Sequence, residues 1–232
     1  NYEDIKPINP RMIYASLSAY GEKGPDKDGK GFDLVAYWAK SGLMDLMRPT
    51  DSSPTQAVPG MGDHPTAVSL YASILTALIH REKTGEGQHV ELSQIEATSQ
   101  LLAPELLAYQ VTGEQATRSG NRKIGSVVHG VYPCAGEERW IAIEAVDETQ
   151  WQALCAVLGN ADVLARARSE GDEPLDNAIA ALSVRLDPFE LMAACRKAGV
   201  PAGVANKGSD LLEDDVFIAR KHFWPLEHAE MG

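Results

Sequence analysis

The sequence predicts an α/β fold in which short strands of a mostly parallel sheet alternate with longer helices. Residues 12–18 form a short apolar run that is typical of a strand buried within a parallel sheet. Residues 65–83 carry apolar side chains along most of their length and predict a long, largely buried helix. Residues 89–93 alternate in polarity and predict a second short strand. This order of strand, helix and strand is that of an α/β protein.

Two loops and a helix are expected between the first strand and the long helix. Residues 21–31 hold four glycines and one proline, a composition typical of a loop. Residues 50–62 are rich in proline, serine and glycine and predict a second loop. Between the loops, residues 32–44 are predicted to form a helix, whose apolar side is expected from Leu34, Val35, Trp38 and Leu43.

Proline and capping residues set the expected ends of the helices. Pro65 stands in the first turn of the long helix, where the N–H that proline lacks would have no partner inside the helix. Residues 93–96 (Ser-Gln-Ile-Glu) have the pattern of a capping box and predict the start of the next helix. That helix is expected to run toward Tyr109, and Pro104 is expected to kink or split it.

A second unit is expected after the polar, glycine-containing stretch of residues 113–128, which reads as a link. Residues 131–133 and 140–145 predict paired strands, and residues 200–205 predict a further strand. Three helices are expected between these strands, at about residues 148–158, 174–185 and 188–197.

Composition and charge exclude several classes of protein. Hydrophobic residues make up 44% of the chain and charged residues 23%, the balance of an ordinary soluble globular protein. No apolar run reaches the length of about 18 residues that a transmembrane helix requires, so we expect no membrane partner. The net charge of −12 repels phosphate backbones, so we expect no nucleic-acid partner. A small phosphate-bearing ligand stays open, because a few cations suffice to bind it.

The cysteines point to a reducing compartment. The sequence has three cysteines, an odd number, at positions far apart and without a Cys-x-x-Cys pair. A disulfide framework or a structural zinc site is therefore not expected, and the cytoplasm is the expected location. The three side chains, which lie in apolar or helical surroundings, are expected to be inert packing residues: Cys134, Cys155 and Cys195.

Asp63 is the residue whose neighbours in the sequence favour a catalytic role. It follows Gly62 and precedes His64-Pro65, so it lies just before the expected start of the long helix. The residue before a proline is biased away from helical backbone angles, which places that start at Pro65. The positive end of the helix dipole favours an ionised carboxylate, the form that acts as a nucleophile. An aspartate at this position is also a common helix cap, so both interpretations stay open at this point.

Several motifs resemble those of family III CoA transferases, the group of formyl-CoA and carnitine CoA transferases. In that family a glycine-aspartate pair precedes a helix that ends in a His-Arg-x-x-Thr-Gly-x-Gly-Gln signature. Here the pair is Gly62-Asp63, and the signature runs from His80 to Gln88. Further similar segments follow in family order, at residues 9–14, 18–21, 24–25, 31–34, 118–122, 140–143 and 199–203. The resemblance covers essentially the whole chain.

The resemblance implies an enzyme that moves CoA between an acyl-CoA donor and a carboxylic acid acceptor, with Asp63 as the catalytic residue. In the family this aspartate attacks the thioester to give an aspartyl anhydride and CoA thiolate. The thiolate returns to make an aspartyl-CoA thioester, from which the acceptor takes the CoA. Coenzyme A enters as a substrate and no metal is implied. The resemblance places the CoA-binding residues at Lys30, Phe32, Met61 and Gly62.

The resemblance also implies an architecture. It implies a partial Rossmann-like large domain at residues 1–118, which binds CoA and carries the nucleophile, and a smaller α/β domain with a return segment at residues 119–232. Family members extend further on the N-terminal side, so the chain is expected to be a fragment that lacks part of the large domain. Family members form homodimers of interlocked ring-shaped subunits, and a homodimer is expected here.

Two other functions remain as alternatives. The α-methylacyl-CoA racemases of the same superfamily share the aspartate but use a histidine, in a Gly-His-Asp run, to exchange a proton. The corresponding run here is Gly31-Phe32-Asp33, and phenylalanine cannot transfer a proton. The second alternative is a non-catalytic truncated fragment. Within the run, Phe32 packs either beside CoA or in the core, and Asp33 either orients groups in the site or caps a helix. Tyr37-Trp38 hint at an aromatic lining.

Overall fold

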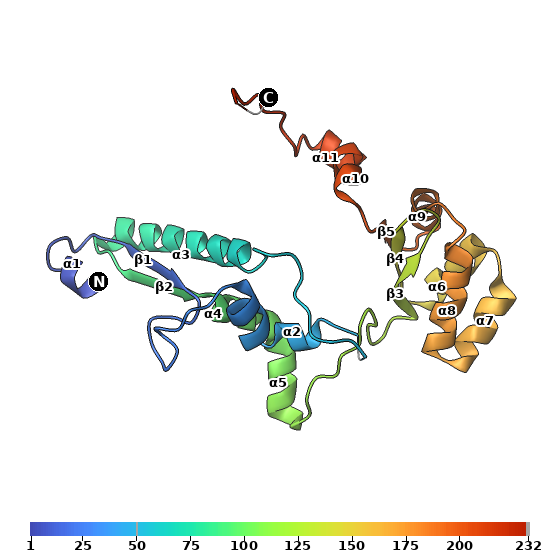
Figure 1. The fold of residues 1–232 in the computed structure, drawn as a ribbon, viewed down its shortest axis with the longest axis horizontal. Coiled ribbons are helices and arrows are strands. Elements are labelled where there is room, and N and C mark those ends of the chain that lie inside the picture. The colour runs from blue at the N-terminus through green and yellow to red at the C-terminus, as the bar shows by residue number, and fades with distance from the viewer. Residues whose placement is uncertain (50, 231–232) are drawn as a thin grey trace. The chain divides into compact units, whose positions relative to one another are not determined.

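The structure, a computed structural model, describes residues 1–49 and 51–230. The chain divides into two compact units, Asn1–Gly120 and Asn121–Gly232, called the first and the second unit below (Figure 1). Thr50, part of the expected loop 50–62, and residues 231–232, part of the expected domain 119–232, lie outside the described residues.

A parallel pair of strands forms the sheet of the first unit. Strand β1 (Tyr14–Ser18) pairs in parallel with β2 (His89–Ser93), so that Tyr14 lies opposite His89 and Ser18 opposite Ser93. The short helix α1 (Tyr2–Ile5) precedes the first strand. Helix α3 (Asp63–Thr84) runs along both strands (Figure 1). The parallel pairing, with helices between its two strands, confirms the expected α/β class.

The sheet of the first unit has two strands, and both β1 and α3 are less buried than expected. Strand β1, expected to be buried, alternates between half-buried and exposed residues, and Leu17 is 44% exposed. Helix α3 was expected to be largely buried, but among its described residues only Thr66 and Ala77 are buried. Val68 is 67% exposed and Ile79 is 59% exposed. Two strands cover only one side of a helix, so the opposite apolar side chains stay in solvent.

The helix expected at residues 32–44 differs in its winding. It is divided into a π-helix, η1 (Asp33–Lys40), and a short α-helix, α2 (Leu43–Leu46). Leu34 and Val35, expected on the apolar side, are about half exposed, whereas the buried residues are Asp33, Ala36, Tyr37 and Trp38. The prediction assumed the turn of an α-helix, but a π-helix is wider and brings different residues to one face.

Helix α3 begins two residues earlier than the rule for residues before proline predicts. Gly62 is its N-cap and Asp63 its first residue, and the N–H of His64 donates to the carbonyl of Gly60 at 3.2 Å. His64 is therefore helical even though it precedes Pro65. Proline is tolerated here because the first turn of a helix has N–H groups without intrahelical partners.

The capping box and the effect of Pro104 are confirmed. Ser93 accepts from the N–H of Glu96, and the Glu96 side chain accepts from the N–H of Ser93 at 3.2 Å, which starts α4 (Gln94–Ser99). A 3₁₀ turn, η2 (Gln100–Leu102), follows, and α5 (Ala103–Thr112) begins with Pro104 in its first turn. The proline therefore splits the expected helix.

The second unit is a three-stranded antiparallel sheet with helices packed against it. Strand β4 (Trp140–Ala145) lies between β3 (Val128–Pro133) and β5 (Ala202–Val204). The helices are α6 (Glu148–Leu158), α7 (Ala161–Glu170), α8 (Asp172–Ser183), α9 (Pro188–Lys197), α10 (Gly208–Glu213) and α11 (Asp215–Ala219). Helix α6 has the predicted bounds, whereas α7 was not predicted. The core joins apolar residues of the strands, such as Ile141 and Ile143, with those of α6, α8 and α9.

None of the helices in residues 1–49 and 51–230 has the length and apolar character that crossing a bilayer requires.

The three cysteines provide a test of this core. Cys134, Cys155 and Cys195 are buried free thiols. Burial raises the pKa of each, that of Cys195 to about 11. Because the thiolate is the reactive form, we expect no labelling by a disulfide reagent such as dithiobis(nitrobenzoate) in the native protein at pH 8, and labelling of all three after unfolding. Rapid labelling of any of them in the native state would contradict this core packing.

Candidate functional site

Asp63 is the first residue of α3, and its side chain is exposed. At this position the positive end of the helix dipole favours the ionised carboxylate. The helix has no side-chain cap hydrogen bond, so the structure does not support the interpretation of Asp63 as a cap. Within residues 1–49 and 51–230, no lysine, arginine or histidine forms an ion pair with this carboxylate. Asp63 is thus an exposed carboxylate at a helix start, without a cation partner among the described residues.

Gly62, the residue before Asp63, is held by hydrogen bonds to both its N–H and its carbonyl group. The N–H of Gly62 donates to Oδ2 of Asp33 at 3.3 Å. The Gly62 carbonyl accepts from Oγ1 of Thr66 at 2.6 Å and from the Thr66 N–H at 3.3 Å. Asp33 and Thr66 are both buried. The Asp33 bond joins η1 to the start of α3, and the Thr66 bonds lie within the first turn of α3, so together they fix the backbone from which the Asp63 side chain projects.

Gly62 has no room for a side chain. A Cβ atom at this position would lie 2.4 Å from Cγ of Tyr37 and 2.6 Å from Oδ1 of Asp33. Its backbone angles, φ −79° and ψ −35°, are ordinary helical values that any residue adopts. Glycine is therefore required here by the close approach of η1 to α3 rather than by its conformational freedom. The resemblance implies that Gly62 binds CoA, and the structure shows that Gly62 has a packing role.

Gln94 supplies the one hydrogen bond that reaches the Asp63 carboxylate among the described residues. Its side-chain Nε2 donates to Oδ1 of Asp63 at 2.6 Å. Gln94 is the first residue of α4 and is 5% exposed. Its Oε1 is buried without a hydrogen-bond partner in the described part of the chain. Bonds to a charged group are among the stronger hydrogen bonds in proteins, and this one holds the carboxylate by a neutral donor.

The other expected site residues are exposed. Phe32 is 80% exposed, which excludes the core position that the sequence left open. Met61, next to Gly62, is 43% exposed. Lys30 is exposed, and no hydrogen bond or ion pair joins it to another residue of 1–49 or 51–230. The structure therefore links Asp33, Gly62 and Asp63 by direct contacts, and leaves Lys30, Phe32 and Met61 available to a ligand.

Three residues in this region differ from what the sequence indicates. Gln94 was seen only as part of a capping box, because nothing in the local sequence shows that its amide reaches Asp63. Tyr37 and Trp38 were expected as an aromatic lining, but they are 2% and 0% exposed. The Tyr37 ring instead lies against Gly62. The role of Asp33 had been left open, and its contact with the Gly62 N–H favours orientation of the site over helix capping.

No group of three or more His, Cys, Asp or Glu side chains within residues 1–49 and 51–230 is arranged to hold a metal ion. The Asp63 carboxylate accepts from the neutral amide of Gln94, its neighbour Gly62 donates to the Asp33 carboxylate, and the exposed His64 follows Asp63 in the chain. This set is suited to nucleophilic attack by the carboxylate.

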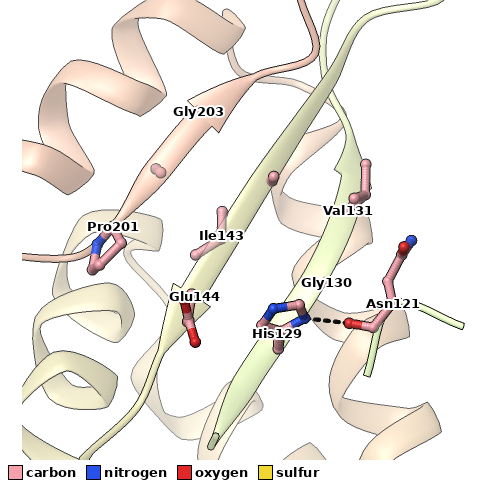
Figure 2. Close-up of a pocket in the computed structure, with 10 residues that line it drawn as sticks. Asn121, His129, Gly130, Val131, Ile143, Glu144, Pro201 and Gly203 are labelled. Atoms are coloured by element: carbon pink, nitrogen blue, oxygen red, sulfur yellow. Dashed lines mark hydrogen bonds between the residues drawn. The ribbon is translucent and has the colours of Figure 1, made fainter. Parts of the chain in front are cut away.

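A separate hollow of about 330 Å³ lies on the sheet of the second unit (Figure 2). Strands β3, β4 and β5 line it together with Asn121, whose carbonyl is hydrogen-bonded to Nδ1 of His129. Glu144 at its rim accepts from Nζ of Lys123 at 2.7 Å, and this bond lowers the pKa of Glu144. The carboxylate is thus paired with a cation, unlike that of Asp63.

Comparisons with known proteins agree on one family. The sequence model of CoA-transferase family III matches residues 1–232. The chain is 27% identical over 227 residues to the succinate–glutarate CoA-transferase of Agrobacterium fabrum, covering 95% of this chain and 56% of that protein. It is 30% identical over 222 residues to the succinyl-CoA:mesaconate CoA-transferase of Haloarcula marismortui, covering 92% of this chain and 55% of that protein.

A solved structure of a CAIB/BAIF family protein from Brucella suis matches with a TM-score of 0.84 at 25% identity. The match covers 99% of this chain and 65% of that one. The chain therefore spans about half the length of the two named relatives and about two thirds of this solved structure.

The close packing at Gly62 predicts a loss of stability in Gly62→Ala. The added Cβ meets the Tyr37 ring and the Asp33 carboxylate, so η1 or the start of α3 must move, and we expect a loss of about 1–3 kcal/mol in the free energy of unfolding. Urea denaturation measures it. Gly208→Ala, at the start of α10 with open space around it, is the matched control and should not destabilise. Equal stability of the two variants would contradict the packing described here.

Proposed function

The chain belongs to CoA-transferase family III, and on this premise we propose that the whole protein moves CoA from an acyl-CoA donor to a carboxylic acid acceptor, with Asp63 as nucleophile. The observation that carries the proposal is the state of the Asp63 carboxylate. It is exposed, lies at the positive end of α3, and is held by a neutral amide rather than by a cation. A carboxylate in this state keeps its charge available for attack.

The proposed reaction proceeds through two kinds of covalent intermediate on Asp63. One carboxylate oxygen attacks the thioester carbon of the donor, forming a C–O bond and releasing CoA thiolate. The thiolate attacks Cγ of the aspartyl anhydride, forms an aspartyl-CoA thioester and releases the donor acid as a carboxylate. The acceptor carboxylate attacks Cγ in turn and releases the thiolate. The thiolate then attacks the acceptor's acyl carbon, which gives the new acyl-CoA and regenerates the Asp63 carboxylate.

The proposed CoA contacts are Lys30, Phe32, Met61 and Gly62. Support comes from the exposure of Lys30, Phe32 and Met61 and from the position of Gly62: Lys30 presents an ammonium that pairs with no residue of 1–49 or 51–230, which suits a phosphate group in a chain of net charge −12. The exposed ring of Phe32 directly precedes Asp33, whose carboxylate contacts Gly62. Met61 and Gly62 immediately precede Asp63 and so flank any thioester that reaches it.

The racemase alternative lacks a proton-transferring group at the corresponding position. Its histidine is replaced by Phe32, and the exposed phenyl ring has no titratable proton. A racemase would exchange the α-proton of a 2-methylacyl-CoA with solvent deuterium without CoA transfer to an added acid. A non-catalytic fragment would neither exchange this proton nor form an adduct. We favour the transferase on the Phe32 observation.

The proposal for the whole protein includes three further features. A homodimer follows from the family. A cytoplasmic location follows from the three free, buried cysteines, which suit a reducing compartment. A reaction without a bound metal follows from the carboxylate chemistry itself, in which Asp63 forms the covalent bonds.

The central test is Asp63→Asn in the full-length protein. We expect wild-type protein incubated with succinyl-CoA, the donor named for one relative, or with other acyl-CoA donors, to yield an Asp63 hydroxamate after hydroxylamine treatment, detected by peptide mass spectrometry. Asp63→Asn should abolish both the adduct and CoA transfer, because the variant has no carboxylate to form the covalent bonds. Stability should change by less than about 1 kcal/mol.

Asp162→Asn is the matched control for this test, since Asp162 also lies in the first turn of a helix, α7. It should leave adduct and transfer unchanged. Full transferase activity in Asp63→Asn would show that another group is the nucleophile.

The CoA contact proposed for Lys30 predicts a selective effect on substrate binding. Lys30→Ala should raise KM for acyl-CoA by roughly tenfold to a hundredfold with little change in kcat, as expected for loss of a charge-assisted hydrogen bond of about 1.5–3 kcal/mol. Steady-state kinetics at fixed ionic strength measures it. Lys23→Ala, an exposed lysine of the same loop, is the control. Equal KM values in Lys30→Ala and wild type would contradict the proposed contact between Lys30 and CoA.

A further inference from the structure

We propose that Gln94 positions the Asp63 carboxylate and that its amide stabilises the negative charge that forms on Oδ1 each time Asp63 Cγ is attacked. The inference deepens the proposed CoA transfer and rests on it. It begins from one contact, the 2.6 Å bond from Gln94 Nε2 to Asp63 Oδ1.

This bond makes the two oxygens of Asp63 different. Oδ1 is engaged by the amide, whereas Oδ2 accepts no hydrogen bond from the described residues. A lone pair shared with a donor is a weaker nucleophile than a free one. Oδ2 is therefore the oxygen that attacks the thioester, and Oδ1 becomes the carbonyl oxygen of the aspartyl anhydride.

The same geometry serves the later steps. When CoA thiolate attacks Cγ of the anhydride, the carbonyl electron pair moves onto Oδ1, and the bond from Cγ to the departing carboxylate then breaks. When the acceptor carboxylate attacks Cγ of the thioester, the charge again collects on Oδ1 before the C–S bond breaks. In both cases Gln94 Nε2 already points at the atom on which charge develops. A donor aimed in advance at such an oxygen lowers the barrier, as in an oxyanion hole.

The surroundings of Gln94 keep its amide in place. The capping box of Ser93 and Glu96 fixes the first turn of α4, and Oγ1 of Thr98 donates to the Gln94 carbonyl at 2.8 Å. Gln94 is 5% exposed, so its side chain has little freedom to turn away. The donor is therefore preorganised and does not have to be recruited during the reaction.

Packing alone does not favour glutamine at this position. Its Oε1 is buried and has no partner in residues 1–49 and 51–230. A buried polar atom without a hydrogen bond opposes folding, and methionine would fill the same space without that penalty. What glutamine adds is the bond to Asp63. The bond joins the first residue of α4 to the first residue of α3, and its acceptor is the exposed carboxylate proposed as the nucleophile.

Gln94→Met, in the full-length protein, tests the inference. Quenched-flow mass spectrometry follows the Asp63 anhydride and thioester during a single turnover with succinyl-CoA, or with whichever acyl-CoA labels the wild type. We expect the steps in which Cγ is attacked to slow by about 10²-fold, the loss typical of one oxyanion donor. KM for acyl-CoA should stay within about twofold, and the urea midpoint should not fall. Gln100→Met is the control, because within the described part of the chain the Gln100 amide donates to the Ala97 carbonyl and not to Asp63.

Gln94→Glu is a second variant of nearly the same shape. It allows the inference to be tested even if Gln94→Met does not fold. Its ionised side chain has no donor, whereas its protonated form regains one. We expect its rate relative to wild type to be lowest at high pH and to recover as the pH falls, a response that a merely structural role would not give.

The possible results separate this inference from the proposed function. A wild-type protein that forms no Asp63 adduct with any acyl-CoA overturns both. An adduct that forms and breaks down equally fast in wild type and Gln94→Met overturns the inference alone. A fall in rate that is matched by a fall in the urea midpoint, without a pH response in Gln94→Glu, also overturns it and assigns Gln94 to the fold.

Discussion

The candidate site depends on the close packing of Gly62 against η1. Because a side chain at this position would overlap Tyr37 and Asp33, only glycine lets η1 and the start of α3 approach so closely. That approach places the Asp33 carboxylate within hydrogen-bonding distance of the Gly62 N–H. Asp63 is the next residue along the helix, so its direction follows from that contact. A small residue with ordinary helical angles thus controls the placement of the residue that performs the proposed chemistry.

Among the described residues, no cation pairs with the Asp63 carboxylate. An aspartate paired with arginine or lysine would be well oriented, but much of its negative charge would be neutralised and its attack on a carbonyl weakened. Asp63 is oriented by the Gln94 amide and favoured as an anion by the dipole of α3, and neither removes its net charge. In the proposed reaction this carboxylate is available to a thioester carbonyl, and in a chain of net charge −12 the phosphates of CoA would require a separate cation, the role proposed for Lys30.

The sequence predicts the features that local signals determine. The capping box at residues 93–96, the split at Pro104 and the bounds of α6 depend on residues a few positions apart, and each is confirmed. The winding of η1, the exposure of α3 and the bond from Gln94 depend on contacts between distant segments. Periodicity shows which residues of a helix are apolar. It does not show how many strands pack against the helix, so it does not determine how many of these residues are buried. The rule for residues before proline failed at His64 because tertiary contacts at Gly62 stabilise the helical start.

The polar groups around Asp63 carry a cost that packing does not explain. Oδ1 of Asp33 and Oε1 of Gln94 are both buried without hydrogen-bond partners among the described residues. Buried polar atoms are almost always paired in native proteins, and exceptions concentrate where function requires a particular group. Each of these side chains does have one bond, and each bond ends on the short segment Gly62-Asp63. The two unsatisfied atoms thus belong to side chains that bond adjacent residues, Asp33 to the N–H of Gly62 and Gln94 to the carboxylate of Asp63, and an apolar side chain at position 94 would avoid the cost of the unpaired Oε1.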